Sequence, residues 1–391
     1  MLDNKVNVRF EENKRVLFLS AANDIHTVRW VNALAKEGIE VHLAFCSDHS
    51  PKVDKIDEKI YLHPLKVKSP FGYYLNQGAL KKICHSIKPA LINAHYASGY
   101  GTLMRLCNYR PALLSIWGSD VYEFPYRNKY NMRLINKNIR YADQISSTSN
   151  IMAEQIKRIS ECYDNQITIV PFGVDLSLFK RNKPYSSKHN GKIRIGIVKR
   201  LKPNYGIDLL IRAFAIVIDG YKQIDNIYDI SLDIYGDGPQ QEDLLKLINK
   251  LKLVNHVRLL GDIPNIKVPE VLETLDLYVL ASYSESFGVS AVEAMAMGVP
   301  IVATDAEGFR EVLDNGKYGI IVPRGNVESL AKAILELIGN NKLRDYYSKI
   351  SRTRVEKLYN WQDNVNSMIK LYSYTVNRYN DIVDKNEVQK W

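Results

Sequence analysis

Residues Ser284–Asp305 read "SESFGVSAVEAMAMGVPIVATD", a loop followed by one helix and one strand. The pattern predicts a helix over about 289–297, because a glycine and a proline follow it as helix terminators. The apolar run that comes next is typical of a buried strand. Two carboxylates, Glu285 and Glu293, lie eight positions apart in this otherwise apolar stretch. Such residues in a buried-looking segment indicate a binding role.

Outside this stretch, apolar strand-like runs alternate with helical patterns along the chain. In the first half "RVLFLSA" precedes "TVRWVNALAKEG" and "IEVHLAF"; in the second, "KIRIGIV" precedes "GIDLLIRAFAIVI" and "SLDIYGDGP". The alternation predicts an α/β fold, with parallel sheets covered by helices on both faces. Ligands of such doubly wound domains bind at the carboxyl ends of the strands, so we expect the site in a cleft between two halves.

The length of 391 residues is too great for one compact core and predicts two domains. Residues 180–191 are polar and rich in turn formers, so the linker is placed there. The N-terminal domain is then predicted over 1–185 and the C-terminal domain over 186–370. The tail from Asn360 onward has a helical pattern with scattered tyrosines.

The net charge of +10 is concentrated in the first half of the chain. Residues 1–187 carry 26 Lys and Arg against 17 Asp and Glu, and residues 51–140 carry 15 against 5. A basic surface attracts an anionic partner such as lipid headgroups or a pyrophosphate-bearing lipid, or it is merely solvated. No nucleic-acid-binding module is visible, so a nucleic acid partner is not expected.

One segment, residues 66–88, combines basic and aromatic side chains, which suits the surface of an anionic membrane. Its members are Lys66, Lys68, Phe71, Tyr73, Tyr74, Lys81, Lys82 and Lys88. The charged N-terminus predicts neither a secretory signal nor an anchor, and no run reaches the roughly 20 apolar residues that span a bilayer. Four separated cysteines (Cys46, Cys84, Cys107 and Cys162) are expected to be reduced thiols in a cytoplasmic protein.

The opening stretch suggests its own chemistry. Gly288 allows a ligand to approach the backbone, and the N–H groups at the start of the predicted helix favour a phosphate. Glu293, one turn further in, can accept two hydrogen bonds from a vicinal diol such as a ribose. Glu285 can accept hydrogen bonds from sugar hydroxyls. Alternatively, Glu285 only favours the helix dipole and Glu293 is solvated.

The stretch "ESFGVSAVEAMAMGVPIVATD" resembles the E-x7-E segment of the retaining glycosyltransferases of family 4, which have the GT-B fold of two Rossmann-like domains. Further motifs resemble that family in the expected order along nearly the whole chain. They are Ile25–Leu43, "SIWGSD" at Ser115–Asp120, "VPFGVDLSLF" at Val170–Phe179, "KRLKPNYGIDLLIRAF" at Lys199–Phe214, "YGDGP" at Tyr235–Pro239, "NGKYGIIVP" at Asn315–Pro323 and "NWQDNV" at Asn360–Val365. The resemblance implies that a final helix, 371–391, returns to the first domain.

The resemblance also implies roles for individual residues. The C-terminal domain would bind a nucleotide-sugar donor and the N-terminal domain the acceptor. Arg200 would neutralise the leaving diphosphate, because a guanidinium is always charged and can donate two hydrogen bonds at once. The implied catalytic residues are Glu285, Arg200 and Lys199, and the implied donor-binding residues are Glu293, Ser286, Phe287, Gly288, Val289, Lys202 and Gly236.

Two positions depart from the family pattern. Tyr205 stands where the family commonly has a lysine, and Lys199 or Lys202 is expected to supply the missing cation, with Lys199 favoured. Trp117 stands where many members have a histidine, and it either stacks on a sugar ring or packs. Asp120 is the remaining polar group at that strand end, or only a helix cap.

Two histidines complete the candidates on the acceptor side. His26, at the start of a helix, and His95, before "YASGYG", either contact a ligand or pack. Neither an Asp-x-Asp pair nor an HExxH spacing occurs in the sequence. We therefore expect no metal and no cofactor.

The resulting prediction is a retaining, metal-independent hexosyltransferase that uses a nucleotide-sugar, a UDP-sugar first of all. Its expected acceptor is a lipid-linked oligosaccharide of cell-surface polysaccharide biosynthesis, such as that of lipopolysaccharide. The expected location is cytoplasmic, peripheral on the inner face of the membrane. The alternatives are a GT-B transferase acting on a soluble glucan and a non-catalytic GT-B partner subunit.

Overall fold

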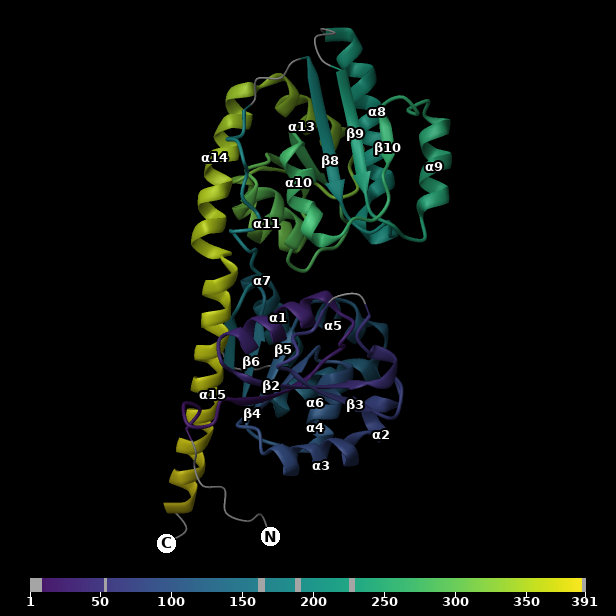
Figure 1. The fold of residues 1–391 in the computed structure, drawn as a ribbon. Coiled ribbons are helices and arrows are strands. Elements are labelled where there is room, and N and C mark those ends of the chain that lie inside the picture. The colour runs from purple at the N-terminus through teal and green to yellow at the C-terminus, as the bar shows by residue number, and fades with distance from the viewer. Residues whose placement is uncertain (1–8, 53–54, 161–165, 187–190, 225–228, 389–391) are drawn as a thin grey trace. The chain divides into compact units, whose positions relative to one another are not determined.

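The computed structural model describes residues 9–52, 55–160, 166–186, 191–224 and 229–388 (Figure 1). The chain divides into two compact units. Unit 1 contains the residues up to Pro171 together with those from Asp363 onward, and unit 2 is Phe172–Gln362. The predicted boundaries, after residues 185 and 370, both lie further along the chain. Cys162 lies outside the described residues.

Residues that follow Pro171 belong to unit 2 because their side chains bond to it. The Arg181 guanidinium donates to the carbonyl of Met297 at 3.3 Å and to that of Glu273. The Tyr185 hydroxyl donates to the carbonyl of Asp276 at 3.0 Å. The polar residues that predicted a linker therefore include side chains, such as those of Arg181 and Tyr185, that bond this segment to unit 2.

Unit 1 is built on a seven-stranded sheet with the order β3-β2-β1-β4-β5-β6-β7, and all its pairings are parallel. The central strands β1, β4 and β5 are almost wholly buried, because helices cover both faces of the sheet. The strands are β1 (Arg15–Leu19), β2 (Glu40–Cys46), β3 (Tyr61–Leu65), β4 (Leu91–His95), β5 (Ala112–Ile116), β6 (Gln144–Ser147) and β7 (Ile167–Ile169).

The helices of unit 1 include the C-terminal one. Helix α1 starts after Asp24, whose carboxylate accepts the backbone N–H of His26 at 2.9 Å as an N-cap. Helix α15 packs on the sheet through Tyr372, whose hydroxyl accepts a hydrogen bond from the Asn93 amide of β4 at 3.0 Å. The helices are α1 (Ile25–Lys36), α2 (Gly72–Leu75), α3 (Gln77–Ile87), α4 (Gly99–Cys107), α5 (Ser119–Tyr122), α6 (Lys129–Tyr141), α7 (Asn150–Ser160) and α15 (Trp361–Val388).

Unit 2 repeats the plan with a six-stranded parallel sheet of order β10-β9-β8-β11-β12-β13. The predicted helix at 289–297 is confirmed as α11. The strands are β8 (Lys192–Val198), β9 (Asp229–Tyr235), β10 (Val257–Leu259), β11 (Leu277–Leu280), β12 (Ile301–Thr304) and β13 (Ile320–Val322). The helices are α8 (Ile207–Ile224), α9 (Gln241–Lys250), α10 (Val268–Glu273), α11 (Val289–Ala296), α12 (Glu307–Val312), α13 (Val327–Gly339) and α14 (Asn341–Leu358).

The predicted α/β class with parallel, doubly wound sheets is therefore confirmed. Each sheet has one point where the strand order reverses, between β1 and β4 in unit 1 and between β8 and β11 in unit 2. Ligand sites of open α/β sheets lie outside the carboxyl ends of the strands at such switch points. Among the helices of the described residues, none combines the length and hydropathy needed to cross a bilayer.

Candidate functional site

The strongest candidate site lies at the switch point of unit 2, where the segments after β8 and β11 meet. Lys199 follows β8 directly, and Glu285 lies in the loop after β11. The Lys199 Nζ lies 2.6 Å from Oε2 of Glu285, and each side chain is only 13% exposed. Desolvating two charges is costly. Groups buried in this way at a strand end are candidates for function, unlike the many exposed ion pairs.

The aromatic ring of Tyr205 contacts the lysine of this pair. Its centroid lies 4.4 Å from the Lys199 Nζ, within the range of a cation–π contact. Burial alone would lower the pKa of Lys199, but the attraction of Glu285, with smaller contributions from Tyr205 and Glu293, raises it. Lys199 is therefore a permanent cation at neutral pH. Tyr205, the first departure from the family pattern, packs against the lysine predicted to replace the missing cation.

Helix α11 begins beside this pair. Its N-cap is Gly288, whose φ of +98° lies in the left-handed region that favours glycine, and no side chain caps the helix. Glu293 lies within the helix and is buried. The ring of Phe287 packs between those of Phe172 and Tyr359, at 5.9 and 5.6 Å. The side chain of Phe287 therefore belongs to the core, and only its backbone remains for a ligand.

Arg324, just after β13, joins the loops around the pair and was not predicted from the sequence. Its guanidinium donates to the Asp305 carboxylate at 3.0 Å, to the Tyr283 carbonyl at 3.0 Å and to Glu307 at 3.2 Å. The loops after β11, β12 and β13 are thereby held together. A basic residue following a strand at the same sheet edge as Glu285 was the only signal for this role.

Gly308 also supports the loop, and it too was missed. Its backbone N–H donates to the carbonyl of Glu285 at 2.8 Å. A Cβ atom at this position would lie 2.5 Å from the backbone nitrogen of Phe287. Only glycine lets the start of α12 lie this close to the loop that carries Glu285.

Replacing Gly308 with alanine is expected to lower the free energy of unfolding by about 1–3 kcal/mol, the usual cost of overpacking. It should also weaken binding of the nucleotide predicted for this loop, because the neighbour is the rigid backbone of Phe287. Chemical denaturation measures the change in the free energy of unfolding, and calorimetric titration measures the change in nucleotide binding. Gly339→Ala is the matched control, since nothing lies within 4 Å of its added Cβ. Equal stability of the two variants would contradict the prediction.

The other predicted donor-side residues lie in the segments that follow β8, β9 and β11. Arg200 and Lys202 are exposed, whereas Ser286 is half-buried in the loop after β11. Gly236 has a φ of +139°, and a Cβ there would lie 2.0 Å from the Lys199 carbonyl oxygen. Gly236 is therefore needed for the contact between the segments after β8 and β9, and its contact with a donor stays a prediction. Val289 is the first residue of α11.

In unit 1, three predicted acceptor-side residues form one aromatic cluster near the carboxyl ends of β4 and β5. The Trp117 ring centroid lies 4.2 Å from that of His95, 5.2 Å from Tyr96 and 5.9 Å from His26. His95 is buried and lies 3.1 Å from the Ser20 hydroxyl. Because Trp117 is also buried, packing accounts for this residue, and stacking on a sugar stays a prediction.

Asp120 is buried in the same region and links two loops. Its carboxylate accepts the backbone N–H of Ala97 at 2.7 Å and that of Gly118 at 2.9 Å. Burial raises the pKa of Asp120, while these two hydrogen bonds oppose the rise. Asp120 lies within α5, whose N-cap is Gly118 without a side-chain cap, so the carboxylate does not cap this helix but ties the loops after β4 and β5 together. A contact between Asp120 and an acceptor stays a prediction.

His95→Gln is expected to flatten the acid side of the stability curve. Burial, with a smaller contribution from His26, lowers the pKa of His95 to about 3, whereas the unfolded chain protonates near 6.5. Between these values the unfolded state binds the extra proton, so falling pH costs the wild type about 1.4 kcal/mol per pH unit. Urea unfolding from pH 7 to 4 measures the slope. The exposed His85→Gln is the control; a slope unchanged in His95→Gln would contradict the prediction.

Comparison with known proteins agrees with this geometry. Residues 179–354 match the family model "Glycosyl transferases group 1", and residues 15–149 match "Glycosyl transferase 4-like". The phosphatidylinositol N-acetylglucosaminyltransferase GPI3 subunit of Saccharomyces cerevisiae is 29% identical over 67% of this chain and 54% of that protein. The chain thus spans about half the length of that relative.

Two further proteins match over most of their length. The capsular polysaccharide biosynthesis glycosyltransferase CapM of Staphylococcus aureus is 24% identical over 85% of this chain and 89% of that protein. The structure of Anabaena HepE in complex with UDP has a TM-score of 0.74 and 17% identity, covering 92% of this chain and 100% of that one. The two family matches show that the chain belongs to the group 1 glycosyl transferases, family 4, and the structural similarity shows the GT-B fold.

Proposed function

We propose that this protein is a retaining glycosyltransferase that transfers a hexose from a nucleotide-sugar, a UDP-sugar, to an acceptor hydroxyl. The observation that carries the proposal is the buried pair of Lys199 and Glu285 at the switch point of unit 2. Beside it, α11 begins at an uncapped glycine and carries the buried Glu293. HepE, a protein of the same fold, was solved with UDP, which supports uridine as the nucleotide.

In this proposal the diphosphate binds at the start of α11, where backbone N–H groups and the helix dipole favour anions. Glu293 accepts hydrogen bonds from the ribose diol, and Glu285 from hydroxyls of the sugar. Lys199 and Arg200 stabilise the charge that develops on the leaving diphosphate, and fixed cations contribute most at that point. These two cations would also take the part that a metal plays elsewhere, so we propose that no metal is required.

The reaction forms a bond between the acceptor oxygen and the anomeric carbon and breaks the bond from that carbon to the phosphate oxygen. Departure and attack on the same face of the sugar would retain the configuration. The proton of the acceptor hydroxyl passes to the leaving phosphate oxygen, so UDP leaves with it. No side chain has to act as a general base, and Glu285 acts by orienting the sugar.

The acceptor is proposed to be a lipid-linked glycan, with the protein peripheral on the inner face of the membrane. The names of two relatives support this class, because GPI3 acts on phosphatidylinositol and CapM serves capsular polysaccharide synthesis. The basic excess of the first half of the chain agrees with an anionic lipid carrier.

Calorimetry with UDP and GDP, with and without a chelator, tests the donor part of the proposal. We expect UDP to bind equally well with and without the chelator, and UDP-sugars to be hydrolysed slowly in the absence of acceptor. Binding of GDP but not UDP would mean that the donor is a GDP-sugar. Failure of both nucleotides to bind, together with no hydrolysis, would instead support a non-catalytic subunit.

A further inference from the structure

Unit 1 exposes an apolar tip at α2. Phe71, Tyr74 and Leu75 are 71%, 47% and 66% exposed, although they lie within five consecutive residues. We call these three residues the α2 tip. Isolated apolar residues on a surface are ordinary, but three large ones on a single turn are a contiguous patch that calls for a partner.

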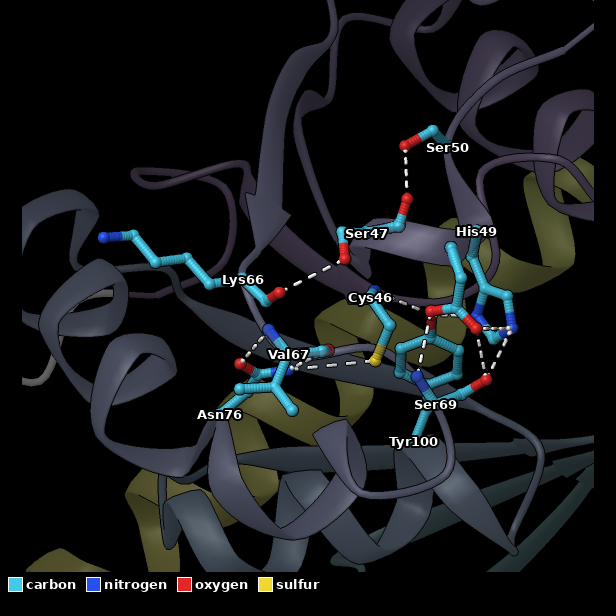
Figure 2. A network of polar contacts seen from close by, with 10 residues as sticks. Cys46, Ser47, His49, Ser50, Lys66, Val67, Ser69, Asn76 and Tyr100 are labelled. Carbon is cyan, nitrogen blue, oxygen red and sulfur yellow. Dashed lines mark hydrogen bonds and ion pairs between the residues drawn. The ribbon is translucent and has the colours of Figure 1, made fainter.

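Polar contacts fix the segment that carries the tip, and Figure 2 shows several of them. The side-chain amide of Asn76 accepts from the Val67 N–H at 3.1 Å and donates to the Val67 carbonyl at 2.9 Å, which closes the loop between β3 and α3. The Ser69 N–H donates to the Asp48 carboxylate at 2.9 Å. The exposed side chains therefore stand on a loop with a defined conformation.

An edge-to-face contact between two tyrosines packs the same turn against α4. The Tyr73 ring lies 5.2 Å from that of Tyr100 in an edge-to-face arrangement, and a Cβ added at Gly99 would lie 2.4 Å from the Tyr73 ring. The Tyr100 hydroxyl in turn accepts the Cys46 N–H at 3.1 Å (Figure 2). Tyr73, one of the aromatic residues predicted for a membrane surface, thus packs inward, while Leu75, which was not predicted, is exposed.

The segment on either side of the tip is basic. Exposed lysines flank it in the sequence, namely Lys66, Lys68, Lys81 and Lys82, which we call the lysine collar. No acidic residue occurs between Glu58 and Asp120. The nearby Asp48 already accepts hydrogen bonds from Ser69. The charge of this surface is therefore complementary to an anion.

We propose that the α2 tip inserts into an anionic membrane surface, with the lysine collar on the lipid headgroups. Apolar and aromatic side chains enter the boundary between headgroups and acyl chains, and lysines gain from the negative surface potential. A protein partner would not need both the exposed apolar residues and flanking lysines in a segment that has no acidic residue between Glu58 and Asp120. This inference rests on the proposed function, because a lipid-linked acceptor requires the enzyme at the membrane.

Sedimentation with phosphatidylcholine vesicles, with and without phosphatidylglycerol, tests the proposal. We expect the full chain to bind only the anionic vesicles, with affinity that falls as salt is raised. Phe71→Ser combined with Leu75→Ser should weaken binding by at least about tenfold, given the area each side chain buries. Lys81→Glu combined with Lys82→Glu should abolish the preference for phosphatidylglycerol.

Matched controls come from α9 of unit 2. Leu245 is exposed and apolar like the residues of the tip, so Leu245→Ser is the control for the serine variants. Lys246→Glu combined with Lys250→Glu is the control for the reversal of charge at Lys81 and Lys82. Neither control should change vesicle binding. UDP binding should persist in every variant, which separates failure of docking from failure of the donor site. Unchanged vesicle binding by the tip variants would overturn the proposal. So would a wild type that ignores vesicles but self-associates through the tip.

Discussion

Replacing Lys199 with methionine is expected to lower kcat for sugar transfer by about 10²–10³-fold, the usual effect of removing one preorganised electrostatic group. Lys199 is nearly buried against Glu285, so no water layer screens its charge from a bound diphosphate. The change also leaves Glu285 without its 2.6 Å partner. The fall should appear in kcat more than in KM, because charge on the leaving group grows toward the transition state.

Two variants make this test specific. Lys192→Met, at the exposed start of the same strand, should leave kcat unchanged. Adding Tyr205→Lys to Lys199→Met should recover part of the activity, because the Tyr205 ring lies 4.4 Å from the original Nζ. Recovery would mean that the family's cation has moved to a new sequence position while keeping its place in space. A variant Lys199→Met with normal kcat would remove Lys199 from the mechanism.

The fold class was predictable because strands buried on both faces leave continuous apolar runs, and parallel strands need helices between them. Helix α11 was predictable for a local reason, since glycine and proline follow it. The unit boundary was harder to predict. Polar residues such as Arg181 resemble a linker in sequence, and only the fold shows that they bond to carbonyls of Glu273 and Met297.

The candidate site was predictable only where one short segment carries it. Glu285, Gly288 and Glu293 lie within nine residues and have a recognisable spacing. Arg324 and Gly308 act on that segment from the ends of other strands, and sequence spacing gives no signal for such contacts. The burial of the Lys199 and Glu285 side chains could not be predicted from the sequence either.

Unit 1 shows the same limit. Trp117 and Asp120 were predicted to stand at a strand end, and they do, but their burial follows from neighbours distant in sequence. His95 packs on Trp117, and Asp120 accepts a hydrogen bond from Ala97, across loops after different strands. Position along a strand was therefore predictable, whereas exposure to a ligand was not.

Glu293→Ala is expected to raise the Kd of UDP by about 10- to 100-fold, the range for losing hydrogen bonds to a charged group. The side chain is buried on α11, where a carboxylate is costly unless hydrogen-bond donors reach it. Ribose hydroxyls would add to the groups that already interact with this carboxylate. Calorimetry gives the Kd directly, and Glu328→Ala, an exposed carboxylate in the first turn of α13, serves as the control.

A double-mutant cycle with 2′,3′-dideoxy-UDP decides whether the ribose is the partner of Glu293. Wild type should bind this analogue about as weakly as Glu293→Ala binds UDP, and the two changes together should cost little more than either alone. That non-additivity is expected only if carboxylate and diol contact each other. Additive losses would mean that Glu293 supports α11 from within, leaving the ribose to other residues of the site.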